Sequence, residues 1–297
     1  MAPLAYRRIG ITVKSGLDHR DDALESVIAY LRKEGAEVFV EESRKDRMPS
    51  GVTLPCFGKL KDIDLLLVIG GDGTILRTVR ELACFSVPVL SVNRGTVGFM
   101  AEMSMDEAPE LLPKFLHGEG YIEERSVLKI VARSGNKVIS EGFVLNEAVI
   151  AQGSIARLID LQTTVNGNEL TTFRADGLII ATPTGSTAYT LAAGGPIVHP
   201  EIAATILTPI NSHTFNQKPI VIPATHVVEV EVLSKPGKFS DAQVSLTLDG
   251  QTFLAVRRGD KIEASVHGER VKFLRRKSET FYGTLRAKLK WGERPED

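Results

Sequence analysis

An uninterrupted apolar run at residues 65–69 leads directly into the turn Gly-Gly-Asp-Gly-Thr at residues 70–74. Such a run is typical of a strand buried on both faces of a parallel sheet. The glycines let backbone N–H groups approach a ligand, and the helical apolar spacing that follows places the turn at a helix N-terminus, which favours phosphate. An acid there would repel phosphate unless it holds a metal or accepts a proton from an attacking hydroxyl. The turn therefore indicates phosphoryl transfer, with Asp72 as the candidate catalytic residue.

Length and composition are those of an ordinary globular protein with room for two domains. The chain has 297 residues, of which 43% are hydrophobic and 25% charged. Its net charge of −1 provides no overall field to attract nucleic acid or a membrane surface. Cys56 and Cys84 lack metal-ligand spacing, and no apolar run reaches the roughly 20 residues needed to span a bilayer. We therefore expect a cytoplasmic protein with no nucleic-acid or membrane partner.

Residues 1–100 alternate strand and helix signals, as in a doubly wound, Rossmann-like α/β domain with a mainly parallel sheet. The glycine turn would then lie at the carboxyl end of a strand, where such folds bind ligands. A capping-box pattern at residues 104–107 predicts a further helix through residue 116. Strands are expected at 9–13, 38–40, 64–69 and 87–92, and helices over 24–31 and 75–83.

After about residue 120, apolar residues alternate with polar ones, which predicts antiparallel strands. Asn166-Gly167, after an alternating segment, is a strong hairpin signal. The final segment around Leu285 returns to helical spacing, and we expect that helix to dock on the first domain. The predicted fold is an α/β domain over residues 1–101 and about 275–297, with a β-rich, mainly antiparallel domain over residues 102–274.

Four further segments contain residue types suited to a ligand site. The loop at 93–99 has two glycines and an arginine, although a tight connection between domains explains it equally well. Asn146-Glu147 is a polar pair in an apolar setting, and it is either a ligand contact or a satisfied turn pair. Residues 176–196 place hydroxyls and small side chains just past a buried strand, which favours a binding site over a plain loop. Asp249-Gly250 predicts only a hairpin turn.

Several common signatures are missing from the sequence. It contains no P-loop and no G-x-G-x-x-G after a strand, and its six histidines show no metal spacing. No nucleophile elbow accompanies Ser186 and Asp176. The run at residues 275–277, Arg-Arg-Lys, is more typical of a solvated face than of a nucleic-acid patch.

Taken together, these segments resemble the NAD kinase family. The resemblance covers nearly the whole chain in order, and its most specific part is Thr-Pro-Thr-Gly-Ser-Thr-Ala-Tyr at 182–189. The Gly-Gly-Asp-Gly turn alone is shared with diacylglycerol-type lipid kinases and phosphofructokinases. Departures are modest: Ala192 stands where serine is common, and residues 211–213 stand where Cys-Pro-His is frequent.

The resemblance implies phosphoryl transfer from ATP, or another donor such as polyphosphate, to the 2′-hydroxyl of the adenosine ribose of NAD, giving NADP. Asp72 would accept the proton, the substrate would bind between the domains, and a divalent cation, generally Mg²⁺, would take part. The family also implies a homo-oligomer, a dimer or tetramer. It implies nucleotide-site positions at Gly70, Gly71, Gly73, Arg77, Asn146, Glu147, Arg157, Arg174, Asp176, Thr187, Ala188, Tyr189, Thr190, Leu191, Ala192 and Gln251. No metal ligands are identified.

Two alternatives stay open on the sequence. A lipid kinase could use the same glycine turn, but it has no support from residues 182–200 and there is no evident membrane-facing amphipathic segment. A non-catalytic dinucleotide sensor would bind NAD without forming NADP, and the intact Asp72 argues against it.

Overall fold

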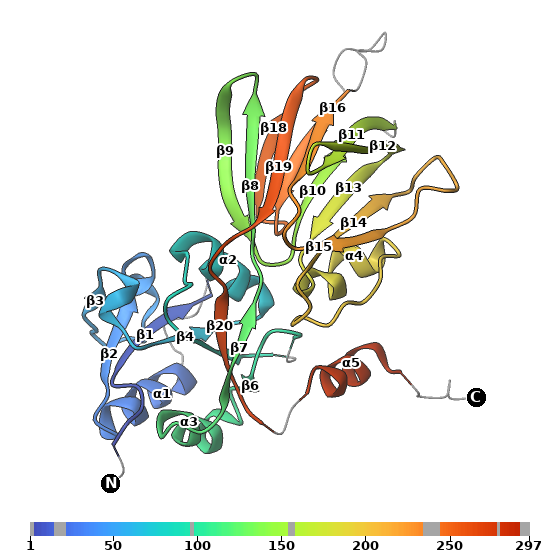
Figure 1. Ribbon diagram of the computed structural model, residues 1–297. Helices are drawn as coiled ribbons and strands as arrows, with labels where there is room; N and C mark the ends of the chain where they lie inside the picture. Colours follow the sequence, from blue (N-terminus) through green and yellow to red (C-terminus); the bar gives the residue numbers. More distant parts are fainter. Residues whose placement is uncertain are drawn as a thin grey trace. The chain divides into compact units, whose positions relative to one another are not determined.

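The computed structural model describes residues 3–14, 22–95, 98–153, 158–233, 244–277 and 280–291. The chain divides into two units, one drawn from residues 1–124 and 271–297 and the other from residues 125–270 (Figure 1).

The first unit is built on one sheet with the strand order β3-β2-β1-β4-β5-β20-β7, and β6 pairs with β5 at one end. Its strands are β1 (Arg8–Val13), β2 (Glu37–Glu41), β3 (Cys56–Phe57), β4 (Leu65–Ile69), β5 (Val89–Asn93), β6 (Met103–Ser104), β7 (Tyr121–Arg125) and β20 (Val271–Arg275). Its helices are α1 (Asp22–Lys33), α2 (Asp72–Leu82), α3 (Ala108–Leu116) and α5 (Phe281–Leu289), with short 3-10 helices at Glu42–Arg47 and Leu60–Asp62.

Parallel pairing places the end of β4 at the topological switch point of this sheet. β1 pairs in parallel with β2 on one side and with β4 on the other, and β4 pairs in parallel with β5. The direction of winding therefore reverses between β1 and β4, and ligands of such sheets bind beyond the carboxyl ends of the strands at this point. The glycine turn follows the last residue of β4 directly.

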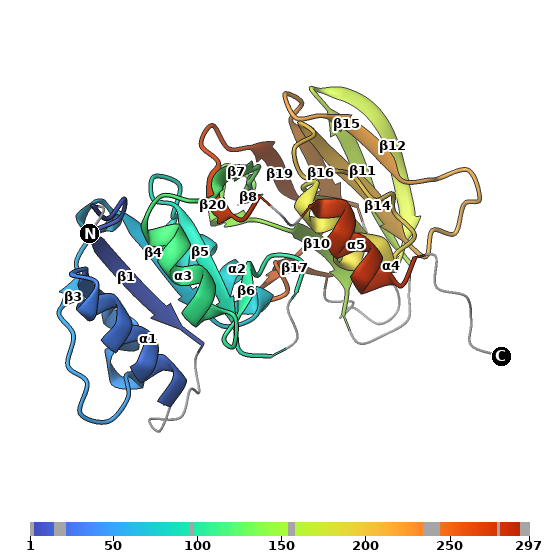
Figure 2. The same cartoon turned by 90° about the horizontal axis from the view of Figure 1, so that it is seen from below.

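Both faces of the sheet are covered, as the apolar run predicts. All five side chains of β4 are buried. On one face, alternate residues of β1 and β4, such as Ile11 and Leu67, share a core cluster with residues of α1 and α3 (Figure 2). On the other face, Arg77 of α2 donates a hydrogen bond to Thr12 of β1.

The second unit contains two six-stranded sheets, ordered β15-β14-β13-β10-β17-β18 and β12-β11-β16-β19-β8-β9. Its strands are β8 (Leu128–Ser134), β9 (Lys137–Val144), β10 (Glu147–Gln152), β11 (Ile159–Val165), β12 (Asn168–Ala175), β13 (Gly177–Ala181), β14 (Ala204–Ile210), β15 (Ile220–Pro223), β16 (Val228–Val232), β17 (Val244–Leu248), β18 (Thr252–Val256) and β19 (Asp260–Val266). A 3-10 helix at Thr184–Thr187 and the short α4 (Tyr189–Ala192) follow β13.

The two sheets of this unit pack over a shared apolar core. Alternate residues of β13, Leu178 and Ile180, join that core, whereas Ile179 and Ala181 on the opposite face pack with Val198 in a second cluster. The segment after β13 therefore lies over the outer face of its own sheet. The packing of Ile179 and Ala181 therefore sets the position at which the segment 182–189, predicted to bind the nucleotide, leaves β13.

The predicted fold class is confirmed. The first unit has a doubly wound, mainly parallel sheet, and the pairs in the two sheets of the second unit are antiparallel. The Asn166-Gly167 hairpin is present, with φ of +50° and +75°. Ser104 and Glu107 make the reciprocal capping-box bonds, at 2.8 and 3.3 Å, and α3 begins one residue later.

The predicted boundary after residue 101 differs from the division into units, because Leu112 and Phe115 of α3 belong to the core of the first unit. The docking of α5 on that unit stays a prediction.

Cys56 and Cys84 are both free. No helix in the described ranges has the length and apolar character needed to cross a membrane.

The core of the first unit can be tested with a pair of isoleucines. Ile11 is fully buried beneath α1, and Ile122 of β7 is 40% exposed. Replacing Ile11 by alanine leaves a cavity and should lower the free energy of unfolding by about 2–5 kcal/mol. Ile122→Ala should cost about 1 kcal/mol or less. Denaturant unfolding of the two variants measures the difference, and equal costs would contradict the described packing.

Candidate active site

The glycine turn places Asp72 at the start of α2. Gly71 is the N-cap of this helix and Asp72 is its first residue. A Cβ at Gly70 would overlap with the side chain of Thr74, so this position requires glycine. The start of an α-helix has N–H groups with no carbonyl one turn before them, which gives this end of α2 a partial positive charge. The turn therefore combines an anion-attracting backbone with one carboxylate.

The Asp72 carboxylate is held by the backbone of a second loop. It accepts hydrogen bonds from the N–H groups of Phe99, at 2.9 Å, and Met100, at 3.3 Å. A Cβ at Gly98 would overlap with both carboxylate oxygens. The loop at 93–99 therefore meets the glycine turn, while Thr96 and Val97 lie outside the described residues.

Arg77, one turn further along α2, joins a buried charge network. Its guanidinium donates to Glu41 of β2 at 3.1 and 3.2 Å and to Glu81 at 2.7 Å. Burial by itself would raise the pKa of Glu41, but hydrogen bonds from Arg77, Ser43 and Thr12 hold that pKa below its ordinary value. Arg77 thus ties α2 to the ends of β1 and β2. Its contact with a phosphate stays a prediction.

In the second unit, the carboxylate of Asp249 organises the Asn146-Glu147 turn. It accepts the backbone N–H groups of Leu145, Asn146 and Glu147 at 2.9, 2.9 and 3.0 Å. Asp249 and Gly250 also form the predicted hairpin turn, with φ of +48° and +64°. The hairpin prediction is confirmed. The sequence pattern does not reveal that Asp249 also accepts the N–H groups of residues 145–147.

The Glu147 carboxyl is buried next to this carboxylate. Glu147 is 7% exposed, and among the described residues its Oε2 has no hydrogen-bond partner. Burial, followed by the negative charge of Asp249, raises the pKa of Glu147 to about 8, although the Tyr189 N–H favours the charged form. Near neutral pH this carboxyl therefore carries a proton and can donate a hydrogen bond.

The hydroxyl-rich segment after β13 packs onto the same turn. Thr182 Oγ1 donates to the Leu145 carbonyl at 2.5 Å and accepts the Gly185 N–H at 3.2 Å. A Cβ at Gly185 would overlap with the Asn146 backbone. Ser186 Oγ donates to Pro183 and accepts the Val198 N–H. The hydroxyls of Thr182 and Ser186 hold the segment in its shape, because both donate and accept hydrogen bonds within the protein.

Several predicted nucleotide residues therefore lie close together in the second unit. The Tyr189 N–H reaches the Glu147 carboxyl, and its side chain is 46% exposed. Thr187 ends the 3-10 helix, Ala188 links it to α4, and α4 contains Thr190, Leu191 and Ala192 beside Tyr189. Gln251 follows the hairpin turn of Asp249 and is exposed.

Arg174 and Asp176 lie elsewhere in this unit. They precede β13, whereas residues 182–189 follow it, so the strand separates the two groups by roughly 20 Å. Arg174 faces Asp160 at 4.0 Å, and Asp176 accepts a hydrogen bond from Asn211 at 3.0 Å. Arg157 lies outside the described residues. The roles of these three residues at a nucleotide stay predictions.

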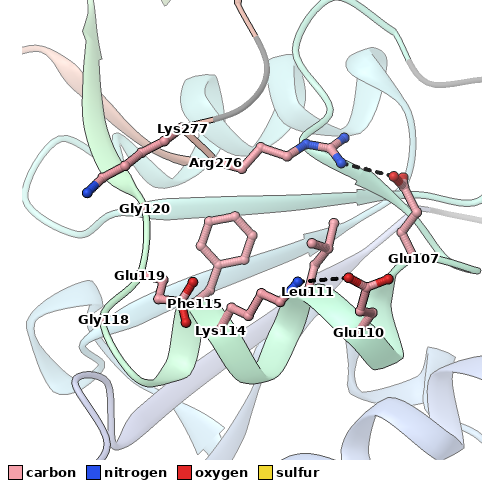
Figure 3. Close-up of a pocket in the computed structure, with 10 residues that line it drawn as sticks. All are labelled: Glu107, Glu110, Leu111, Lys114, Phe115, Gly118, Glu119, Gly120, Arg276 and Lys277. Atoms are coloured by element: carbon pink, nitrogen blue, oxygen red, sulfur yellow. Dashed lines mark hydrogen bonds and ion pairs between the residues drawn. The ribbon is translucent and has the colours of Figure 1, made fainter.

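A hollow of about 590 Å³ lies beside α3 and the end of β20 (Figure 3). Two ion pairs join side chains drawn there: Arg276 with Glu107 at 2.9 Å and Lys114 with Glu110 at 2.7 Å. None of the predicted site residues lines this hollow. Its charges are largely balanced internally, so we assign it no ligand.

The fit of a divalent cation depends on Asp72. Among the described residues, no three His, Cys, Asp or Glu side chains cluster in a way that could hold a metal ion. Mg²⁺ in kinases is commonly bound through one or two carboxylates together with the phosphates of the substrate. A single carboxylate at a phosphate-attracting helix end suits that mode of binding.

Comparison with known proteins identifies the family. The family profile described as ATP-NAD kinase N-terminal domain matches residues 9–120, and the profile described as ATP-NAD kinase C-terminal domain matches residues 145–276. The chain belongs to the NAD kinase family. The predicted family and enzyme class are confirmed.

Curated relatives and solved structures agree with this assignment. The NAD kinase of Geobacter metallireducens is 42% identical over 78% of this chain and 80% of its own length, and that of Syntrophotalea carbinolica is 37% identical over 97% and 100%. An Archaeoglobus fulgidus NAD kinase solved in complex with ATP has a TM-score of 0.70 at 26% identity, covering 95% of this chain and 98% of that one. Yeast NADH kinase complexed with NADH has the same fold, with a TM-score of 0.84 at 24% identity, covering 99% of this chain and 89% of that one.

Sequence patterns missed two residues that shape these NAD kinase segments. Asp249 reaches the Asn146-Glu147 turn from more than 100 positions away in the chain. The expectation of a solvated face at 275–277 is wrong for Arg275, whose guanidinium is buried and paired with Glu102 and Glu123. A charge run gives no local signal of partners so distant in the sequence.

The loop that holds Asp72 offers a matched pair of glycines. A side chain at Gly98 would displace the Asp72 carboxylate, whereas a Cβ at Gly95 meets nothing within 4 Å. We expect Gly98→Ala to lower kcat for NADP formation about ten- to a hundred-fold, because the carboxylate loses its position. Gly95→Ala should stay within about two-fold of the parent enzyme. Similar losses in both variants would contradict this reading of the loop.

The raised pKa of Glu147 predicts a pH-dependent stability. Because its pKa in the folded state lies above the ordinary value, its stabilising contribution is complete below about pH 4.5 and is lost as the pH rises through about 8. Glu147→Gln stays neutral and keeps that contribution. Thermal unfolding should show the variant gaining stability relative to the parent between pH 5 and 9.

The exposed Glu169 of β12 provides the control for this measurement. Glu169→Gln should follow the parent with a constant offset across the same pH range. A Glu147→Gln curve that runs parallel to the parent would show that Glu147 is ionised in the folded protein throughout.

Proposed function

We propose that this chain transfers the terminal phosphoryl group of ATP to the 2′-hydroxyl of the adenosine ribose of NAD, producing NADP and ADP. The observation that carries the proposal is the Asp72 carboxylate, which two backbone N–H groups hold at the N-terminus of α2. Membership of the NAD kinase family supports NAD as the acceptor.

In this reaction Asp72 is the proton acceptor. The bond between the terminal phosphorus and its bridging oxygen breaks as the ribose oxygen bonds to that phosphorus. The hydroxyl proton passes to the Asp72 carboxylate, and ADP leaves. The positively polarised start of α2, which follows Gly70 and Gly71, offsets the phosphate charge, and this is the main requirement of phosphoryl transfer. The Gly70 N–H itself donates to the Val92 carbonyl at 2.9 Å and so holds the turn in place.

The second unit binds the adenosine half of NAD in this proposal. Asn146 and the protonated Glu147 provide hydrogen bonds to the ribose and base, which is consistent with the buried Glu147 Oε2, for which the described part of the chain supplies no partner. The half-exposed ring of Tyr189 stacks on the base, with Thr187 and Ala188 beside it. These groups orient the acceptor, and such positioning is a large part of catalysis between two substrates.

We infer that a divalent cation, Mg²⁺ by preference, would be held beside Asp72 chiefly by the phosphates of the donor. The bound cation would neutralise part of the negative charge of the phosphates. A cation bound directly to Asp72 would make this carboxylate a weaker base, so the proposal keeps proton acceptance as the task of Asp72.

ATP is the proposed donor, supported by the ATP complex of the archaeal relative. The test is to incubate the purified protein with NAD and Mg²⁺, adding ATP in one reaction and polyphosphate in another, and to quantify NADP. ATP-dependent NADP formation is expected. NAD binding by calorimetry without NADP from either donor would favour the sensor alternative instead.

We further infer a cytoplasmic homo-oligomer, a dimer or tetramer. The free Cys56 and Cys84 are consistent with a reducing compartment. Light scattering coupled to size-exclusion chromatography measures the assembly, and a monomer at micromolar concentration would contradict it.

The proton-acceptor role of Asp72 can be tested directly. Asp72→Asn keeps the shape of the side chain but removes its basicity, so kcat should fall on the order of 10²–10⁴-fold with the fold retained. Asp106→Asn, at an exposed position of the same unit, is the control and should retain full turnover. Near-normal turnover in Asp72→Asn would remove Asp72 from this role.

A further inference from the structure

The backbone segment 99–102 is hydrogen-bonded on two sides within the first unit. On one side, the N–H groups of Phe99 and Met100 donate to Asp72. On the other side, the Met100 carbonyl and the Glu102 N–H bond to groups of the central sheet. The segment therefore connects the candidate catalytic carboxylate to the core.

Two donors from different strands converge on the Met100 carbonyl. Ser91 of β5 donates from Oγ at 3.0 Å, and the Arg275 guanidinium at the end of β20 donates from Nη1 at 2.9 Å. Ser91 also accepts the Glu102 N–H, through Oγ at 3.0 Å and through its carbonyl at 3.1 Å. The peptide groups next to those that hold Asp72 are thus fixed by three bonds to β5 and one to β20.

Arg275 is itself held in place by buried charge. Its Nε donates to Glu123 at 2.7 Å and its Nη1 also donates to Glu102 at 3.2 Å, and only 7% of the residue is exposed. Displacing this guanidinium would take a cation away from two buried carboxylates, although Glu102 would keep its pair with Arg276 at 3.2 Å, and such a loss is unfavourable. The planar fork of arginine also fixes the direction of each N–H bond. The guanidinium of Arg275 therefore has a fixed position from which it holds the Met100 carbonyl.

We propose that Arg275 and Ser91 are positioning residues for phosphoryl transfer. They fix the Met100 carbonyl, so that the N–H groups of Phe99 and Met100 keep the Asp72 carboxylate in the orientation that accepts the proton. The proposal rests on the proposed function of Asp72. Neither residue touches Asp72 itself, and both act through the backbone of residues 99–102.

The first experiment uses two conservative variants. Ser91→Ala removes one donor to the Met100 carbonyl with little change in volume. Arg275→Lys keeps a positive charge between Glu102 and Glu123 but loses the fork that also reaches Met100. We expect kcat to fall about three- to ten-fold in Ser91→Ala and about ten- to a hundred-fold in Arg275→Lys, with the KM for NAD within about two-fold of the parent.

Ser126→Ala is the matched control, because Ser126 is a buried serine outside this segment. It should leave kcat unchanged. A loss of kcat in Ser91→Ala no larger than that in Ser126→Ala would overturn the proposal. Arg275→Lys can also lower stability, so all kinetics are measured at a temperature where circular dichroism shows each variant folded.

A double-mutant cycle with Asp72→Asn separates positioning from general stabilisation. If Ser91 and Arg275 act through Asp72, their substitution in an Asp72→Asn background should change the residual kcat by less than about two-fold. Full additivity of the losses would overturn the positioning role and leave the function of Asp72 intact. Parent-like turnover in Asp72→Asn alone would instead overturn the proposed function, and this proposal with it.

Discussion

Parallel pairing of β4 with β1 and β5 is the constraint on which the candidate active site depends. The five side chains of β4 are buried, and the strand pairs in a continuous register with β1 on one side and β5 on the other. Its carboxyl end therefore has a fixed position at the switch point of the sheet. Gly70 and Gly71 turn the chain there, and α2 begins with Asp72 at the first position where the helix end attracts anions.

The two units use the same physical device at their candidate sites. In each, an aspartate that adjoins a glycine accepts backbone N–H groups from a loop distant in the chain: Asp72 from Phe99 and Met100, and Asp249 from residues 145–147. A carboxylate with several N–H donors has a defined orientation, and the loop that supplies them loses conformational freedom. The conformational entropy of the backbone that supplies these N–H groups is therefore lost on folding, and less remains to be lost when a nucleotide binds.

The local parts of this arrangement follow from the sequence, and the distant parts do not. The run at 65–69, the glycine turn, the Asn166-Gly167 hairpin and the Ser104–Glu107 pair are determined by neighbours within a few residues, so periodicity and turn chemistry suffice. Asp249 and Arg275 depend on partners 104 and 175 positions away. Nothing in a Leu-Asp-Gly-Gln turn or a run of three basic residues indicates such partners. The family resemblance correctly gave the reaction class, yet it gave no sign that Arg275 is buried.

The discontinuity of the first unit affects the order in which the protein is completed. β20 lies between β5 and β7 in the sheet, although it follows the entire second unit in the chain. During synthesis, β1 to β7 emerge long before β20, so the sheet has a vacant position between β5 and β7 until residue 275 is available. Contacts of such long sequence separation form slowly because a large loop must close first. Glu102 and Glu123 can pair with Arg275 only after residue 275 has been synthesised. A nascent chain therefore contains the glycine turn well before it contains Arg275, the buried residue that contacts the segment at 99–102.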